Sequence, residues 1–184
     1  MKKHGPWTIK ESRERFQGKM FRVFEDEVRR PDGTDGTYAT ININPGVETL
    51  ALDADGFVYL VKEFRYAAGR ETIECVGGGI DEGEESVDAA RRELREELGI
   101  EAEEWTELGE LQYATSIVTS PAKIFLARSL KFVEKDEDSG EVIETVKMPF
   151  AEAVEKALNG EFVHAISCVL ILRAQHYLNA VKSE

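Results

Sequence analysis

A run of three glycines at positions 77–79, followed by a glutamate-rich segment, constrains this chain of 184 residues more than any other feature. The segment ends in RELREELGI at residues 92–100, with glutamates at 93, 96 and 97. A helix turns by about 100° per residue, so these three side chains share one narrow face. The adjacent face is apolar and consists of Val87, Ala90, Leu94 and Leu98. The pattern therefore predicts a helix that is buried on one side and acidic on the next.

Three neighbouring carboxylates repel one another and destabilise an isolated helix. A bound cation reverses that effect, and hard oxygen ligands suit Mg²⁺ or Mn²⁺. The ordinary alternative is a solvated helix with a charged face. That alternative explains neither the glycine-rich entry nor the spacing of Glu84 and Arg92.

The whole segment resembles the box of the Nudix family, G-x5-E-x7-R-E-[apolar]-x-E-E-x-G-[apolar]. Its nine defined positions are filled by Gly78, Glu84, Arg92, Glu93, Leu94, Glu96, Glu97, Gly99 and Ile100. The resemblance implies a hydrolase of a pyrophosphate bond that depends on Mg²⁺ or Mn²⁺. It also implies an α/β (α+β) fold, the Nudix α/β/α sandwich with a mixed sheet.

The resemblance assigns roles to the residues of the box. The metal ligands would be the carbonyl of Gly77 and the carboxylates of Glu93, Glu96 and Glu97, and these three carboxylates would also be catalytic. Arg92 would pair with Glu84 and, together with Gly78, hold the loop against the helix. The glycines either allow backbone to approach a metal or phosphate, or form a tight turn that requires positive φ, and both can hold.

Two residues outside the box narrow the resemblance to hydrolases of ADP-ribose and nucleoside-diphosphate sugars. Arg65, in VKEFR at 61–65, and Glu74, just before the glycines, match positions that contact substrate in that subgroup. The plain readings are a surface arginine and a glutamate at a strand edge. The subgroup also uses an additional N-terminal β region for dimerisation, which implies a homodimer here.

The chain departs from this subgroup after the box. Residues 114–116, Ala-Thr-Ser, stand where ADP-ribose hydrolases carry Ser-Pro-Gly, and Ser120 takes the following acidic position. The catalytic base must then come from elsewhere. Glu141 and Glu144 are candidates, because some relatives draw a glutamate from that region, and a solvated loop or strand edge is the alternative.

Composition limits the partners. The net charge of −13 argues against a nucleic-acid polymer or an anionic membrane surface as a partner. A local metal site still permits a small phosphorylated substrate. The chain shows no apolar run long enough to span a membrane and no apolar core after its first lysines. We therefore expect a cytoplasmic protein.

Turn residues divide the chain into predicted elements. Two strands at 19–29 and 37–43 form a hairpin around RPDG, and Asn44-Pro45-Gly46 interrupts the pattern. We therefore predict an N-terminal β-hairpin region at 1–44, serving dimerisation, and a Nudix hydrolase domain at 45–184. Within the latter we expect a hairpin of 47–52 with 57–63, and helices from Pro149 to Leu158 and over 164–180.

The sequence thus favours a small-molecule nucleotide as substrate. ADP-ribose is the first choice, with release of a nucleoside monophosphate and a phosphorylated product. GDP-mannose or another nucleotide sugar is the alternative substrate. A module that senses a nucleotide without turnover is an alternative of another class, although it has no need for a full set of metal ligands.

Overall fold

The computed structural model describes residues 1–135 and 142–181. The chain divides into two compact units. The first unit consists of Met1–Pro45 and Gln112–Pro121, and the second of Gly46–Leu111 and Ala122–Glu184. Each unit has its own sheet.

The first unit is a five-stranded sheet in the order β1-β2-β3-β4-β10. Its strands are β1 (Lys2–His4), β2 (Trp7–Gln17), β3 (Phe21–Arg29), β4 (Asp35–Ile43) and β10 (Val118–Thr119). The predicted hairpin is present, because β3 and β4 pair antiparallel from Phe21↔Ile43 to Arg29↔Asp35. Gly33 has a φ of 86° in the connecting turn. Such a φ is routine only for glycine.

Two parts of this sheet were not expected from the sequence. One is the strand β2, which is eleven residues long and precedes the hairpin. Its first residue, Trp7, packs edge-on against Tyr38, with 5.5 Å between the ring centroids. The short β10 comes from the segment between the two long strands β9 and β11 of the chain, and it pairs parallel to β4.

The second unit contains a mixed sheet of seven strands. Its central path is β12-β6-β5-β11-β9, with β7 paired to β6 and β8 paired to β5. The strands are β5 (Gly46–Leu52), β6 (Phe57–Arg65), β7 (Arg70–Glu74), β8 (Val76–Gly79), β9 (Ile100–Gln112), β11 (Pro121–Phe132) and β12 (Glu144–Pro149). The predicted hairpin of β5 and β6 is confirmed by antiparallel pairing. The pair β5–β11 is parallel, so the sheet is mixed as predicted.

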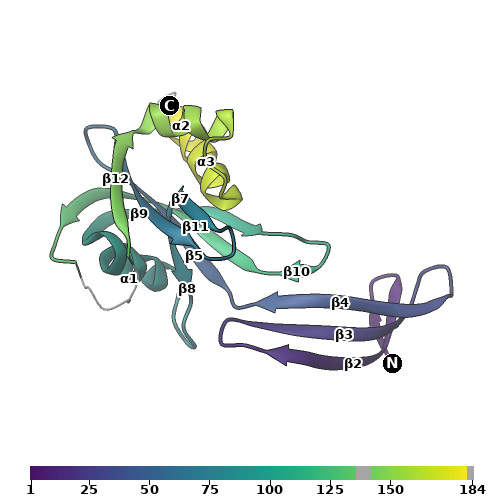
Figure 1. Ribbon diagram of the computed structural model, residues 1–184. Helices are drawn as coiled ribbons and strands as arrows, with labels where there is room; N and C mark the ends of the chain where they lie inside the picture. The colour runs from purple at the N-terminus through teal and green to yellow at the C-terminus, as the bar shows by residue number, and fades with distance from the viewer. Residues whose placement is uncertain (136–141, 182–184) are drawn as a thin grey trace. The chain divides into compact units, whose positions relative to one another are not determined.

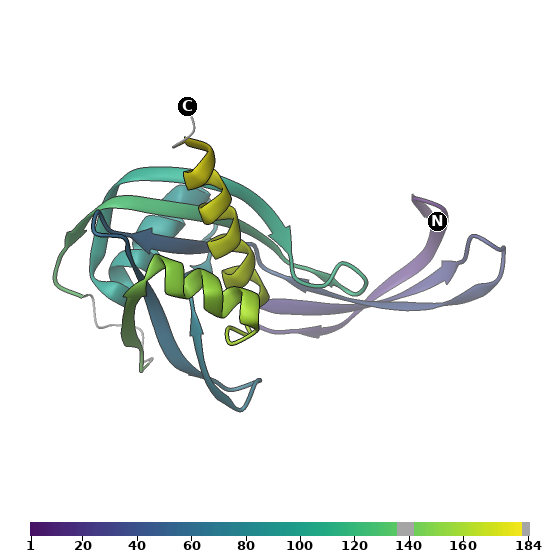
Figure 2. The same ribbon diagram turned by 90° about the horizontal axis from the view of Figure 1, so that it is seen from above.

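Helices cover both faces of this sheet (Figures 1 and 2). They are α1 (Ser86–Leu98), α2 (Phe150–Asn159) and α3 (Ala165–Val181). Alternation along β5 explains the layers, since successive side chains of a strand point to opposite faces. Leu50 and Leu52 belong to the core with α2 and α3, whereas Ala51 packs with Leu94 of α1. The predicted sandwich is confirmed. Among the described residues, the helices do not combine the length and the apolar character of a membrane span.

Candidate active site

The strand β8 carries the glycines, and α1 follows it. Gly77 pairs with Glu48 and Gly78 with Val47 in the antiparallel ladder between β8 and β5. The helix α1 buries the predicted Ala90, Leu94 and Leu98, and Ala89 in addition. It ends at Leu98. The next residue, Gly99, closes the last turn with a φ of 62° and N–H bonds to the carbonyls of Leu94 and Arg95.

The glycines provide space for carboxylates. None of residues 77–79 has a positive φ, so a turn that requires positive φ does not explain them. A Cβ on Gly77 would lie 2.6 Å from the nearest carboxylate oxygen of Glu48, and a Cβ on Gly78 would overlap the carboxylate of Glu93. At Gly79 a Cβ would meet nothing within 4 Å. Two carboxylates therefore occupy the room that side chains at 77 and 78 would fill.

Arg92, on α1, contacts the end of β8 and the loop that connects β8 to α1. Its Nε and Nη2 donate to the two carboxylate oxygens of Glu84, both at 3.1 Å, and Nη2 also donates to the carbonyl of Gly79 at 2.9 Å. Its Nη1 reaches Glu93 at 2.7 Å and Glu96 at 3.2 Å. The expected contact of Arg92 with Glu84 is therefore present. The hydrogen bond from Arg92 holds the pKa of Glu84 below its ordinary value.

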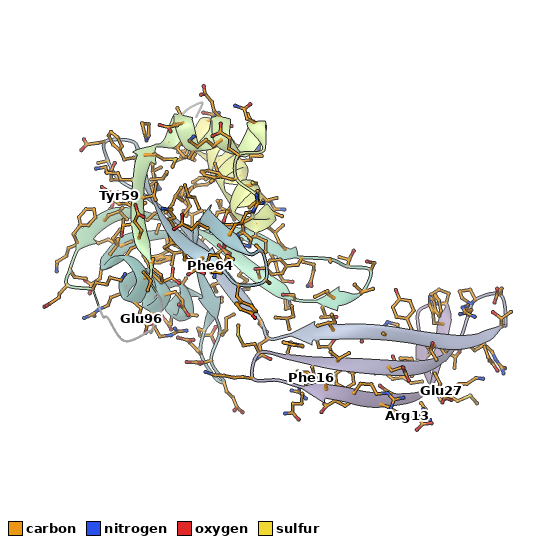
Figure 3. All side chains as sticks on the ribbon, in the orientation of Figure 1. Arg13, Phe16, Glu27, Tyr59, Phe64 and Glu96 are labelled. Carbon is orange, nitrogen blue, oxygen red and sulfur yellow. The ribbon has the colours of Figure 1, made fainter. Side chains whose placement is uncertain are left out.

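The acidic face of α1 is partly buried. The side chain of Glu96 is 40% exposed, and Figure 3 shows it on α1, whereas Glu93 is 14% exposed. Burial raises the pKa of Glu93, and the hydrogen bond from Arg92 opposes this rise. Among the described residues, no three histidine, cysteine, aspartate or glutamate side chains are already grouped closely enough to hold a metal ion. In this arrangement Arg92 holds Glu93 and Glu96.

Arg65 and Glu74 lie beside each other. Arg65 donates from Nε and Nη2 to one oxygen of Glu74, at 3.1 and 2.7 Å, and also pairs with Glu63. Thr72 donates to the other oxygen of Glu74 at 2.7 Å. Burial would raise the pKa of Glu74, but these hydrogen bonds outweigh it and the pKa is lowered. The arginine is 40% exposed and the glutamate 6% exposed, so Arg65 is the member of the pair that solvent reaches.

Glu144 and Glu141 are the two candidates for the catalytic base. Glu144 begins β12 and forms an exposed ion pair with Lys62 at 3.1 Å. Glu141 lies outside the described residues.

Sequence reasoning missed two polar residues near the glycines. Glu48 is buried in β5, and the Nδ1 of His164, just before α3, lies 3.5 Å from Glu74 and 2.9 Å from the hydroxyl of Ser167. Burial lowers the pKa of His164 and raises that of Glu48 well above its ordinary value, with Glu74 and Glu97 adding to the rise at Glu48. One signal was available, because Glu48 is the single charged residue in the otherwise apolar and hydroxylic run VETLAL.

Comparison with known families identifies the family of this chain. The NUDIX domain model matches residues 43–166. The chain belongs to the Nudix family. A second model, the nucleoside diphosphate sugar hydrolase N-terminal domain, matches residues 7–41. With its glycine loop and acidic helix in place, this protein is a Nudix hydrolase, and members of the family generally use divalent metal ions.

Individual relatives extend over most of the chain. It is 32% identical over 158 residues to the ADP-ribose pyrophosphatase of Mycobacterium tuberculosis, covering 84% of this chain and 76% of that protein. It is 26% identical to the ADP-ribose pyrophosphatase of Bacillus subtilis, covering 91% and 92%. A solved structure described as an ADP compounds hydrolase has the same Nudix fold, with a TM-score of 0.86, 24% identity and 98% of each chain covered.

Proposed function

We propose that this Nudix hydrolase cleaves the pyrophosphate bond of ADP-ribose with Mg²⁺, Mn²⁺ serving as a substitute. Water forms a new bond to one phosphorus, the bond from that phosphorus to the bridging oxygen breaks, and AMP and ribose 5-phosphate leave. The names of the relatives from Mycobacterium tuberculosis and Bacillus subtilis support this substrate. The match of residues 7–41 to a nucleoside diphosphate sugar hydrolase domain supports nucleotide sugars such as GDP-mannose as the second candidate.

The observation that carries the proposal is the carboxylate of Glu93 seated over Gly78. It places a partly buried acidic group against the backbone of β8, at the residue that follows Gly77. The residues present fit a divalent cation, because Gly77, Glu93, Glu96 and Glu97 offer the hard oxygen ligands that Mg²⁺ prefers. When bound, such a cation neutralises charge on phosphate oxygens and acidifies a water molecule.

The protein groups then have separate tasks. Glu93, Glu96 and Glu97 would bind the cation. Arg92 orients Glu93 and Glu96 through its ion pairs with them, and Glu84 holds Arg92. Arg65 contacts the phosphates or ribose of the substrate, and Glu74 orients Arg65 through their two hydrogen bonds. Glu141 or Glu144 accepts the proton of the attacking water.

A homodimer built through residues 1–44 is part of the proposal. Within the described residues, β1 pairs with β2 only at Trp7–Ile9, so residues 10–17 present one edge of β2 without a strand beside it. An antiparallel copy centred on Ser12 would set Glu11 opposite Arg13 and Lys10 opposite Glu14. Oppositely charged cross-strand pairs of this kind favour association, and an isologous two-fold interface is the commonest solution.

The test is a substrate panel with product analysis. ADP-ribose, GDP-mannose, a dinucleotide and ATP are incubated with Mg²⁺, Mn²⁺ or EDTA, and products are separated by anion exchange. We expect AMP from ADP-ribose in the presence of metal and none in EDTA. Release of GMP from GDP-mannose with ADP-ribose untouched would favour the second substrate. Tight nucleotide binding with no turnover of any compound would support the sensing module instead.

A further inference from the structure

Glu48 is a buried acidic residue that the Nudix box does not contain. It lies in β5 with 6% of its surface exposed, between Val47 and Thr49, which are also buried. Its Oε2 accepts no hydrogen bond from any residue that the structure describes. An ionised carboxylate buried in this way is costly unless a cation or hydrogen-bond donors compensate it.

Within the described part of the chain, the charged groups that act on Glu48 do not offset its burial, although Arg65 opposes the rise of its pKa. Glu74 and Glu97 both act on Glu48 as like charges. The cation that faces it, Arg65, donates its hydrogen bonds to Glu74. Glu48 is therefore a buried carboxyl on which more negative than positive groups act.

His164 offers a structural reason for Glu48, but the distances do not favour it. The imidazole Nδ1 lies 3.9 Å from the nearer oxygen of Glu48, beyond hydrogen-bond range. It is closer to Glu74, at 3.5 Å, and to Ser167, at 2.9 Å. Burial also lowers the pKa of His164, which weakens it as a cationic partner.

The carboxylate of Glu48 points to the glycine loop instead. Glu48 and Gly77 are directly paired in the ladder of β5 and β8. The carboxylate covers Gly77 so closely that a Cβ there would lie 2.6 Å from Oε1 and 3.0 Å from Oε2. Gly77 is the residue whose carbonyl is assigned to the cation under the proposed function.

We propose that Glu48 is an additional carboxylate ligand of the divalent cation, binding it together with the carbonyl of Gly77 and with Glu97. This inference rests on the proposed metal-dependent function and adds a ligand from β5 to those of α1. A bound cation would turn the repulsion between Glu48 and Glu97 into shared attraction. It would also occupy the oxygen of Glu48 that lacks a hydrogen bond.

The test measures Mn²⁺ binding by electron paramagnetic resonance and calorimetry on the full chain, without substrate. Glu48→Gln keeps the volume and removes the charge, and Glu103→Gln, an exposed residue of β9, controls for the change in net charge. We expect Glu48→Gln to weaken Mn²⁺ binding by about tenfold or more. Glu103→Gln should bind as wild type does. The melting temperature of metal-free Glu48→Gln should equal or exceed that of wild type.

A second variant separates ligation from a general effect of charge. Glu48→Asp keeps the charge but withdraws the carboxylate by one methylene. If Glu48 binds Mn²⁺ directly, this change lowers the affinity for Mn²⁺. If Glu48 acts only through its charge at a distance, the affinity stays the same. If Glu48→Asp or Glu48→Gln binds Mn²⁺ within about twofold of wild type, Glu48 is not a ligand and this inference alone is overturned. If wild type binds no Mn²⁺ and hydrolyses nothing in the substrate panel, the proposed function fails together with it.

Discussion

At the scale of single residues, the site depends on the space over two glycines and on the charge of one arginine. Neither Gly77 nor Gly78 has a positive φ, and the atoms nearest to a Cβ at these positions are those of the carboxylates of Glu48 and Glu93. Arg92 contacts two carboxylates of the acidic face and ties them to the loop. At this scale the positive charge of Arg92 offsets part of the repulsion among the glutamates of the acidic face.

Glu97→Gln tests the acidic face directly. The change keeps the side-chain volume and removes one negative charge, so we expect kcat to fall by about two orders of magnitude or more if charge at the cation site supports catalysis. Without metal, stability should stay equal or rise, because Glu97 and Glu48 no longer repel. Steady-state hydrolysis at saturating Mg²⁺ and thermal melts in EDTA give the two readings. Near-wild-type kcat would show that α1 is only a charged surface, and Glu103→Gln serves as the control.

The pair of Glu84 and Arg92 makes stability depend on pH. The hydrogen bond from Arg92 lowers the pKa of Glu84 below 4.5 in the folded state. Its contribution to stability is therefore complete above pH 4.5 and is lost as the pH falls through the folded value. We expect denaturant melts of wild type to lose stability over this acid range. Glu84→Gln should lose less, and identical slopes for the two proteins would contradict the assignment.

At the scale of elements, hydrophobic periodicity and turn residues predicted those helices and strands whose own sequence shows a clear pattern. The helix α1, the hairpin of β3 and β4 and the helix α3 all combine an apolar pattern or a turn sequence with clear ends. The strand β2 was missed because KESRERFQ, at residues 10–17, carries almost no apolar residue, and residues 11–17 are exposed. Glu48 was missed because a strand pattern does not reveal which buried position faces a loop that comes thirty residues later.

The strand β8 gives a matched pair of substitutions. Gly78→Ala places a methyl group on the carboxylate of Glu93, whereas Gly79→Ala meets nothing within 4 Å. Because Glu93 must shift and its bond with Arg92 is disturbed, we expect Gly78→Ala to cost about 1–3 kcal/mol of stability. Gly79→Ala should change stability by less than about 0.5 kcal/mol, as an open site allows. Urea melts at neutral pH measure both, and equal losses would mean that the space over Gly78 is not constrained.

At the scale of the whole molecule, the two units have separate sheets and separate kinds of surface. The second unit contains the site and both helical layers. The first unit is a sheet without a helix, and ion pairs join its strands β2 and β3, such as that of Arg13 with Glu27 at 2.9 Å; Figure 3 labels both residues. Among the described residues, 10–17 of β2 have no strand along one edge, and this is the edge through which we propose that two copies associate.

The proposed homodimer makes a clear prediction for solution mass. Light scattering at micromolar concentration should give twice the chain mass of 20.6 kDa. A double change of Glu11→Lys and Glu14→Lys would set like charges opposite each other in the proposed pairing. This variant should shift the mass towards the monomer while its circular dichroism spectrum stays unchanged. A wild-type protein that is monomeric at this concentration would refute the dimer.

The short parallel strand β10 has a consequence for how such a chain is assembled and altered. Residues 112–121 complete the sheet that the first 45 residues begin, although some seventy residues separate the two in sequence. Removing the N-terminal region would leave residues 112–121 without the strand they pair with. Exchanging that region between two homologues would likewise need a second, matching exchange inside the hydrolase sequence. The N-terminal region is thus only one of two segments of the chain that form the first unit.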